Sequence, residues 1–275
     1  MRMPLVLPSE SMRPEHPLDP PREELELRAG PVSYTCTGSG RPLVAVHGMP
    51  ASGRDFRWLD AAMTGRMRMV RPDLPGFGAS PVAGHAGCTV QDFAAVVIEF
   101  CEALALDDAV MLGHSMGGPI ALQAAARSPQ IAALALVSSA GPMFHRGIFP
   151  RTYRVALRIS DVHPALRRLT LAVGKPIARA VGFSKRLSDD EMIRAVRFCA
   201  GYRPRVFEET LSRLDKPVLI AWADDDRAVE PRVSRALVAC VENPHRVCFE
   251  TGGHNLQSSR AVELADALVA WADAL

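Results

Sequence analysis

Short runs of apolar residues alternate along the chain with longer segments in which apolar positions recur every three or four residues. The first pattern is typical of buried strands and the second of helices that cover them. Because parallel strands need a connecting helix, this alternation predicts a fold of the α/β class with one wound sheet. Eight strands are expected, at residues 25–29, 32–36, 43–47, 67–71, 109–113, 131–137, 217–223 and 246–250.

Three of these runs are apolar almost without interruption, and they begin at Leu43, Val110 and Val218. A strand with one solvated face would alternate apolar and polar residues. Continuous runs therefore indicate strands that are covered on both faces, as in a mostly parallel sheet flanked by helices. These three strands are expected at the centre of the sheet.

Helical patterns fill the intervals between the strands. They lie at residues 90–104, 116–127, 232–241 and 260–275. Between residues 141 and 214 the strand signals stop, and three further amphipathic helices are predicted. These lie at residues 154–159, 164–173 and 188–199, the last of them behind a capping box that starts at Ser188.

This pattern divides the chain into three parts. The proline-rich residues 1–22 are expected to be a flexible leader. Residues 23–141 and 213–275 form the predicted core, and residues 142–212 form a helical insertion. The insertion has 14 Lys and Arg against six Asp and Glu, a local balance of +8. Such a surface can attract an anionic substrate or an anionic membrane surface, with solvated helix faces as the alternative.

Composition excludes several classes of protein. Of 275 residues, 48% are hydrophobic and 23% charged, which is enough to bury a large core. The 32 basic and 30 acidic side chains give no electrostatic reason to bind nucleic acid. The six cysteines show no metal-ligand spacing, and neither a secretory signal nor an apolar run of membrane-spanning length is present. The chain is expected to be cytoplasmic, without metal, cofactor or stable membrane insertion.

The sharpest chemical signal is the pentapeptide Gly113-His114-Ser115-Met116-Gly117, between a predicted strand and a predicted helix. A serine at such a turn takes a strained backbone conformation, and the flanking glycines let neighbouring backbone approach. The start of the helix also supplies backbone N–H groups beside a forming oxyanion. Ser115 is therefore the candidate nucleophile. An ordinary helix-capping serine in a glycine-rich turn is the alternative.

A serine hydroxyl is a weak nucleophile, so this interpretation requires a general base, normally an imidazole held by a carboxylate. Asp226 and His254 both follow predicted strands. The order Ser, Asp, His, with each residue just past the carboxyl end of a strand, is the one expected for this turn. Asp224 and Asp225 precede Asp226, so either could be the orienting carboxylate instead.

Backbone donors for an oxyanion are expected on two loops. His47-Gly-Met-Pro50 follows an apolar strand and can present the N–H of Met49, while Met116 follows the candidate nucleophile. Removing one such donor typically lowers the rate by about 10² to 10³. Met49 and Met116 are therefore the predicted pair.

Residues beside this predicted chemistry are candidates for lining an apolar pocket, with core packing as the alternative. They are His47, Met49, Met116, Met143, Phe144 and Val229. His47 and His114 are also expected to be polar supports held by hydrogen bonds. Asp73 is expected to tie its own turn together. His145 is expected to lie on the surface, with a place at the border of a pocket as the alternative.

With these residues in place, the chain resembles the α/β-hydrolase fold family over residues 23–275. The motifs that carry the resemblance are His47-Gly-Met-Pro50, Arg71-Pro-Asp-Leu-Pro-Gly-Phe-Gly-Ala-Ser80, Gly113-His-Ser-Met-Gly-Gly118, and the loops that hold Asp226 and Gly253-His254. The resemblance implies an eight-stranded sheet with residues 142–212 as a helical cap.

The resemblance also implies roles for individual residues. Ser115 would be the nucleophile, His254 the base and Asp226 the orienting carboxylate, with the N–H groups of Met49 and Met116 as oxyanion donors. Asp226 is favoured over its neighbours because the segment after it matches the family's D-x-x-V-P pattern, with one extra residue before the proline. The chain also departs from the family at Ala223, where members commonly have glycine.

The predicted function is a cofactor-independent serine hydrolase that cleaves a carboxylic ester or similar small acyl substrate, apolar or anionic, through an acyl-enzyme on Ser115. The same triad would serve a carbon–carbon bond hydrolase, a lactonase, a perhydrolase or an acyltransferase. Relatives that cleave carbon–carbon bonds often have tryptophan after the catalytic histidine, where this chain has Asn255. Dehalogenases and epoxide hydrolases carry aspartate at the nucleophile position, whereas this chain has Ser115, which argues against both activities. A ligand-binding receptor with little turnover is the alternative from another class.

Overall fold

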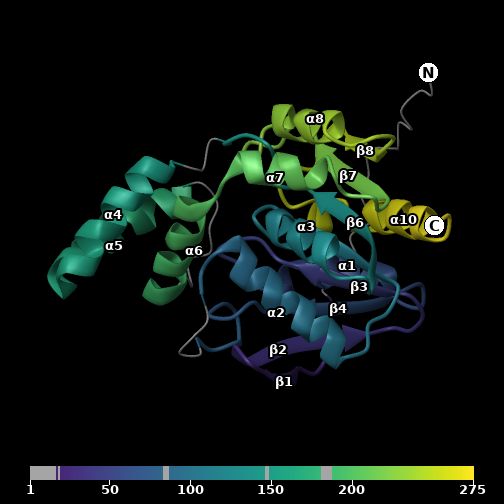
Figure 1. Cartoon of the computed structure of the whole chain (residues 1–275), viewed down its shortest axis with the longest axis horizontal. Coiled ribbons are helices and arrows are strands. Elements are labelled where there is room, and N and C mark those ends of the chain that lie inside the picture. The colour runs from purple at the N-terminus through teal and green to yellow at the C-terminus, as the bar shows by residue number, and fades with distance from the viewer. Residues whose placement is uncertain (1–16, 18, 83–86, 146–148, 181–187) are drawn as a thin grey trace.

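The centre of the molecule is an eight-stranded sheet with strand order β1-β2-β4-β3-β5-β6-β7-β8 (Figure 1). The structure is a computed structural model and describes residues 17, 19–82, 87–145, 149–180 and 188–275. The strands are β1 (Glu23–Leu27), β2 (Gly30–Thr37), β3 (Pro42–Val46), β4 (Arg68–Pro72), β5 (Ala109–His114), β6 (Ile131–Val137), β7 (Val218–Ala223) and β8 (His245–Phe249). β2 pairs antiparallel with both β1 and β4, and the other neighbours are parallel. The predicted α/β class and mostly parallel sheet are confirmed.

Helices cover both faces of this sheet because successive strand residues point to opposite sides. On β3, Val44 and Val46 belong to the core that includes residues of α2 (Val90–Ala103), α3 (Gly117–Arg127) and α8 (Pro231–Ala239). Leu43 and Ala45 belong to a second core, which includes residues of α1 (Arg57–Met63) and α10 (Ala261–Ala272). The continuous apolar runs predicted for central strands arise from these two cores.

The segment between β6 and β7 carries helices. They are α4 (Pro150–Val162), α5 (Pro164–Ala180), α6 (Asp189–Gly201) and α7 (Pro204–Leu211). In Figure 1, α4 and α5 extend to one side of the molecule, with α6 between them and the sheet. Ser188 and Glu191 form the predicted capping box. The role of residues 142–212 as a cap remains a prediction.

Two short helices follow the loops that carry residues of the site described below. The 3-10 helix η1 (Gly53–Phe56) follows the loop after β3, and α9 (Leu256–Ser259) follows the loop after β8. The predicted leader, residues 1–22, lies outside the described residues except for 17 and 19–22. In that part, Asp19 pairs with Arg54 at 3.0 Å and Arg22 with Asp73 at 2.7 Å.

Candidate active site

Ser115 lies in a tight turn between β5 and α3. Its φ is +53°, in the left-handed region that residues other than glycine and asparagine seldom adopt. The turn is pressed against the end of β3, because a Cβ on Gly117 would lie 2.3 Å from the carbonyl oxygen of Val46 and one on Gly48 would lie 3.0 Å from Ser115 Cβ. Glycines allow this close approach and hold Ser115 at the carboxyl end of the parallel strands.

Ser115 is joined to His254 by a hydrogen bond. The distance between Ser115 Oγ and His254 Nε2 is 3.0 Å, and that between His254 Nδ1 and Asp226 Oδ2 is 2.9 Å. The carboxylate accepts the Nδ1 proton, which leaves Nε2 as an acceptor for the serine hydroxyl. Three residues that are far apart in the sequence thus form one hydrogen-bonded chain.

Asp226 is buried and strongly hydrogen bonded. Its other oxygen, Oδ1, accepts the backbone N–H groups of Ala228 at 2.8 Å and Val229 at 3.0 Å. Burial alone would raise the pKa of Asp226, but the hydrogen bond and charge of His254, together with these two N–H groups, lower it below its ordinary value. Asp226 is therefore an anion at neutral pH, placed to hold the His254 ring and to stabilise a proton on it.

The two neighbouring aspartates have different partners. Asp225 Oδ1 accepts the backbone N–H of Gly253 at 2.7 Å, which fixes the residue before His254. Asp224 lies at the surface, where it pairs with Arg235 at 3.0 Å. The structure therefore places Asp226, among the three, against the His254 side chain.

The predicted oxyanion donors are the backbone N–H groups of Met49 and Met116. Met49 follows Gly48, which packs against the Ser115 side chain, and Met116 directly follows Ser115. Within the described part of the chain, neither N–H donates a hydrogen bond to another protein group. Their role as oxyanion donors remains a prediction.

The two histidines that were predicted as supports are buried and hydrogen bonded. His47 Nε2 accepts the backbone N–H of Leu74 at 3.0 Å, so Nδ1 carries the proton that faces the carbonyl oxygen of Gly48 at 2.8 Å. His114 Nε2 donates to the carbonyl oxygen of His254 at 3.0 Å. These bonds hold the backbone of the two loops that flank Ser115.

Asp73 connects the turn after β4 to the neighbouring loop. Its carboxylate accepts the backbone N–H groups of Gly53 at 2.7 Å and Ala79 at 2.8 Å. Ser80 Oγ donates to the carbonyl oxygen of Asp73 at 2.7 Å. Asp73 thus ties its own turn together, as predicted, and also fixes the start of η1.

Burial changes the protonation of two histidines around the site. Burial first, and then the nearby charge of His254, lowers the pKa of His114 to about 3. The same two causes lower the pKa of His145 to about 4. The surface position predicted for His145 is wrong, because its side chain is packed beside the Asp226 loop and is 9% exposed. Both rings are neutral at physiological pH.

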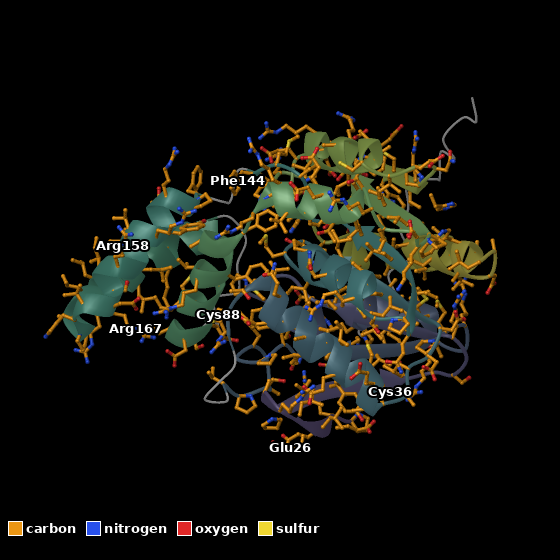
Figure 2. The ribbon with its side chains drawn as sticks, in the orientation of Figure 1. Glu26, Cys36, Cys88, Phe144, Arg158 and Arg167 are labelled. Atoms are coloured by element: carbon orange, nitrogen blue, oxygen red, sulfur yellow. The ribbon has the colours of Figure 1, made fainter. Side chains whose placement is uncertain are left out.

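The residues predicted to line a pocket are in varied surroundings. His47, Met49, Met116 and Val229 are buried, Met143 is partly buried, and Phe144 is 43% exposed (Figure 2). Phe144 stacks edge-to-face on Tyr202, with ring centroids 6.3 Å apart. Val229 acts on the site through its backbone N–H, which binds Asp226. Pocket lining by these side chains remains a prediction.

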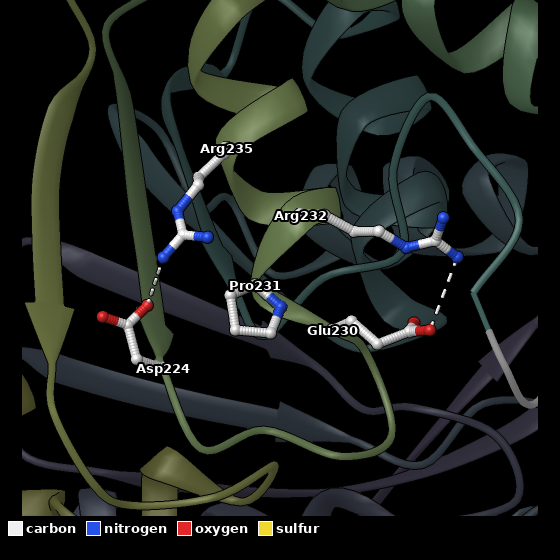
Figure 3. Close-up of a pocket in the computed structure, with 5 residues that line it drawn as sticks. All are labelled: Asp224, Glu230, Pro231, Arg232 and Arg235. Carbon is white, nitrogen blue, oxygen red and sulfur yellow. Dashed lines mark hydrogen bonds and ion pairs between the residues drawn. The ribbon is translucent and has the colours of Figure 1, made fainter.

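A surface hollow of about 620 Å³ has none of Ser115, His254 and Asp226 in its lining. It is lined by residues around the start of α8, which are Asp224, Glu230, Pro231, Arg232 and Arg235 (Figure 3). Two ion pairs, Arg235 with Asp224 and Arg232 with Glu230, occupy its charged groups. None of the residues predicted to line a pocket takes part in it.

Sequence reasoning missed the role of Asp225 and the presence of a further carboxyl group. Asp55 lies on η1, where burial raises its pKa and the nearby His47, Arg57 and His254 oppose that rise. No motif marks Asp55, because its place near His254 depends on how η1 packs against α9. The signal for Asp225 was its position next to Asp226, which did not reveal its backbone partner.

Neither a metal-ligand cluster nor a membrane-spanning helix is found among the described residues. No group of three or more His, Cys, Asp or Glu side chains there is placed to hold a metal ion. No helix in the same part of the chain is long and apolar enough to cross a membrane.

Comparisons with known proteins agree with this fold. A sequence model described as "Alpha/beta hydrolase family" matches residues 43–267. The chain is 28% identical to "Uncharacterized hydrolase YugF" of Bacillus subtilis (strain 168), over 79% of this chain and 85% of that protein. It is 27% identical to "Magnesium-chelatase 30 kDa subunit" of Rhodobacter capsulatus, over 89% and 92%. A solved esterase from Exiguobacterium antarcticum is similar in fold, with a TM-score of 0.73, 19% identity, and 91% and 98% covered.

Proposed function

The chain belongs to the alpha/beta hydrolase family, and we propose that it is a serine hydrolase that cleaves carboxylic esters or similar small acyl compounds through an acyl-enzyme on Ser115. The observation that carries this proposal is the hydrogen-bonded chain from Ser115 through His254 to Asp226, set in a strained turn. An ordinary capping serine needs neither a positive φ nor an imidazole partner. This arrangement supports nucleophilic catalysis over the capping alternative.

The proposed reaction has two halves. In the first, His254 Nε2 takes the hydroxyl proton while Ser115 Oγ bonds to the acyl carbon, and His254 then gives the proton to the departing alkoxide. In the second, His254 takes a proton from water as the water oxygen attacks the acyl carbon. The acid is released when Oγ leaves as a hydroxyl. The negative oxygen of each tetrahedral intermediate would be bound by the N–H groups of Met49 and Met116.

The supporting residues keep this machinery in a productive state. Asp226, with its lowered pKa, remains charged and stabilises the imidazolium that forms in both halves. Neutral His114 donates to the His254 carbonyl and adds no second positive charge beside the imidazolium. Asp225 holds Gly253 from the other side. The base is thus positioned through both its ring and its backbone.

The proposed substrate is a small acyl compound with an apolar acyl part. Met49 and Met116 are buried near Ser115 in the chain or in space, and their side chains make the surroundings of Ser115 apolar. The basic insertion favours an anionic group at the outer end of the substrate. Cytoplasmic location and the absence of a cofactor remain predictions.

A ligand-binding or subunit role is the second candidate, and the magnesium-chelatase subunit among the relatives favours it. Such a role needs no turnover, whereas the intact Ser115, His254 and Asp226 chain supports an enzyme. The two functions are separated by whether turnover of any acyl substrate depends on Ser115.

The test is a kinetic panel of p-nitrophenyl esters of increasing acyl length, with lactones, diketones, and alcohol or peroxide acceptors added. Ser115→Ala should lower turnover by about 10⁴ to 10⁶. Ser128→Ala is the matched control, since Ser128 is also a buried serine at an end of α3 and its hydroxyl has no hydrogen-bond partner among the described residues. Turnover in Ser115→Ala within tenfold of wild type would disprove the proposal.

A further inference from the structure

Helices α4 and α5 form an antiparallel hairpin, called here the α4–α5 hairpin, that projects from the body of the molecule (Figure 1). Its inner side packs on α6 in a small apolar cluster. The buried members are Leu171, Met192 and Ile193, with Leu157 packed against them. The outer side of the hairpin is therefore free to face solvent or a partner.

Six aliphatic side chains lie on that outer side, each between 37% and 75% exposed. They are Val155, Ile159 and Val162 on α4, and Leu166, Leu169 and Val173 on α5. Their spacings of three and four residues place each group of three on one face of its helix. Single exposed apolar residues are common on proteins, but here each of two adjoining helices exposes a row of three.

The sequence of the hairpin as a whole is strongly basic. Residues 150–180 contain seven Lys and Arg against one Asp, a balance of +6. The aspartate, Asp161, is already paired with Arg197 of α6. Two of the basic groups, Arg167 and Lys175, pair with aspartates at the start of α6. The charge of the hairpin is therefore only partly neutralised within the protein.

Three arginines remain available for an external partner. Arg151, Arg158 and Arg168 have no acidic partner among the described residues. Arg151 and Arg158 share a stripe with Val155 and Val162, because these four positions are three or four residues apart. Arg158 and Arg167 mark the two helices of the hairpin in Figure 2. Basic and aliphatic side chains are thus interleaved on the outer face of α4, and Arg168 adds an exposed positive charge on α5.

Exposed aliphatic side chains together with these arginines fit one kind of partner better than others. A second copy of the chain would bring arginines against arginines, which is unfavourable in an apolar contact. A folded protein partner is typically anchored by aromatic side chains that fill pockets, whereas these stripes are aliphatic and lie on the convex outside of two helices. A bilayer accepts convex apolar side chains without a matching shape, and anionic headgroups pair with the arginines.

We propose that the outer face of the α4–α5 hairpin binds the surface of bilayers that contain anionic lipid. Val155, Ile159, Val162, Leu166, Leu169 and Val173 enter the boundary between headgroups and acyl chains. Arg151, Arg158 and Arg168 contact lipid phosphates. The association is peripheral and reversible, and it depends on the hairpin alone, not on the proposed chemistry at Ser115.

The test is flotation of the full-length protein with extruded vesicles of phosphatidylcholine, with and without phosphatidylglycerol. Wild type should float with the anionic vesicles at about 50 mM salt, much less at about 500 mM, and little with phosphatidylcholine alone. Vesicle binding needs no turnover, so its outcome is separate from that of the ester assays.

Two sets of variants locate the contact. The triple substitution Arg151→Ala, Arg158→Ala and Arg168→Ala should weaken vesicle binding about 100-fold, since each arginine near an anionic surface contributes about fivefold. Val162→Ser with Leu169→Ser should also reduce binding and its resistance to salt. Circular dichroism and thermal unfolding check that these surface variants fold.

The matched control removes the same charge elsewhere. Arg127, Arg213 and Arg246 are exposed and outside the hairpin, so their triple substitution by Ala should retain most of the binding. Absence of wild type from anionic vesicles at low salt would overturn the proposal. Equal losses in the two triple variants would also overturn it. So would binding to soluble polyglutamate without vesicle binding, or a wild-type dimer that the serine variants dissociate.

Discussion

The buried histidine beside the candidate nucleophile makes folding stability depend on pH. In the folded protein the pKa of His114 is about 3, against 6.5 for an exposed histidine. As pH falls below 6.5 the unfolded chain takes up a proton at this residue and the folded chain does not. The contribution of His114 to the free energy of unfolding is therefore fully present above about pH 6.5. It is lost as the pH falls from 6.5 toward 3.

The size of this effect follows from the two pKa values. Between about pH 7 and about pH 5, His114 alone should lower the free energy of unfolding by about 2 kcal/mol. His114→Gln removes the titrating ring, and its side-chain amide can still donate to the His254 carbonyl oxygen. This variant should lose about 2 kcal/mol less than wild type over the same pH interval.

Urea unfolding at a series of pH values measures the difference. His163→Gln is the control, because His163 lies at the surface between α4 and α5 and its substitution leaves the buried rings in place. His145, with a pKa of about 4, adds a similar pH dependence to all three proteins. If wild type and His114→Gln had the same pH dependence, the buried neutral state of His114 would be refuted.

Three further predictions test separate parts of the structure. Asp226→Asn should lower kcat/KM by about 10⁴ in ester assays, whereas Asp224→Asn at the surface should leave it within a few-fold of wild type. Gly117→Ala should lower the free energy of unfolding, measured by urea titration, by about 3 kcal/mol or prevent folding, because the new Cβ would lie 2.3 Å from a backbone oxygen. Gly174→Ala is the control. It has open space around it and should raise that free energy by about 0.5 kcal/mol or more. Thr89→Ala should lower it by about 1 kcal/mol, because the side chain caps α2.

The sheet could be predicted from the sequence because burial on both faces leaves a direct pattern. Residues 43–47 and 217–223 were expected as strands, and β3 (Pro42–Val46) and β7 (Val218–Ala223) end or begin within one residue of those bounds. The short helices α1 and α7 were not predicted. Each has only seven or eight residues, so its apolar spacing repeats too seldom to stand out.

The candidate site was visible in the sequence where chemistry restricts residue type. Ser115, Asp226 and His254 were expected from one turn motif and chain order, and the structure brings their side chains to hydrogen-bond distance. Asp225 and His145 could not be assigned in this way. Asp225 binds a backbone N–H that any residue would supply, and the burial of His145 depends on packing between loops distant in the sequence.

The most direct test of an activated Ser115 is the intact mass of the protein after exposure to a fluorophosphonate, which reacts with nucleophilic serines. Wild type should gain one phosphonyl adduct, located on Ser115 by peptide mapping, and Ser115→Ala should gain none. Ser128→Ala should react as wild type does. Folded wild type without an adduct, or equal modification of Ser115→Ala, would contradict the assignment of Ser115 as the nucleophile.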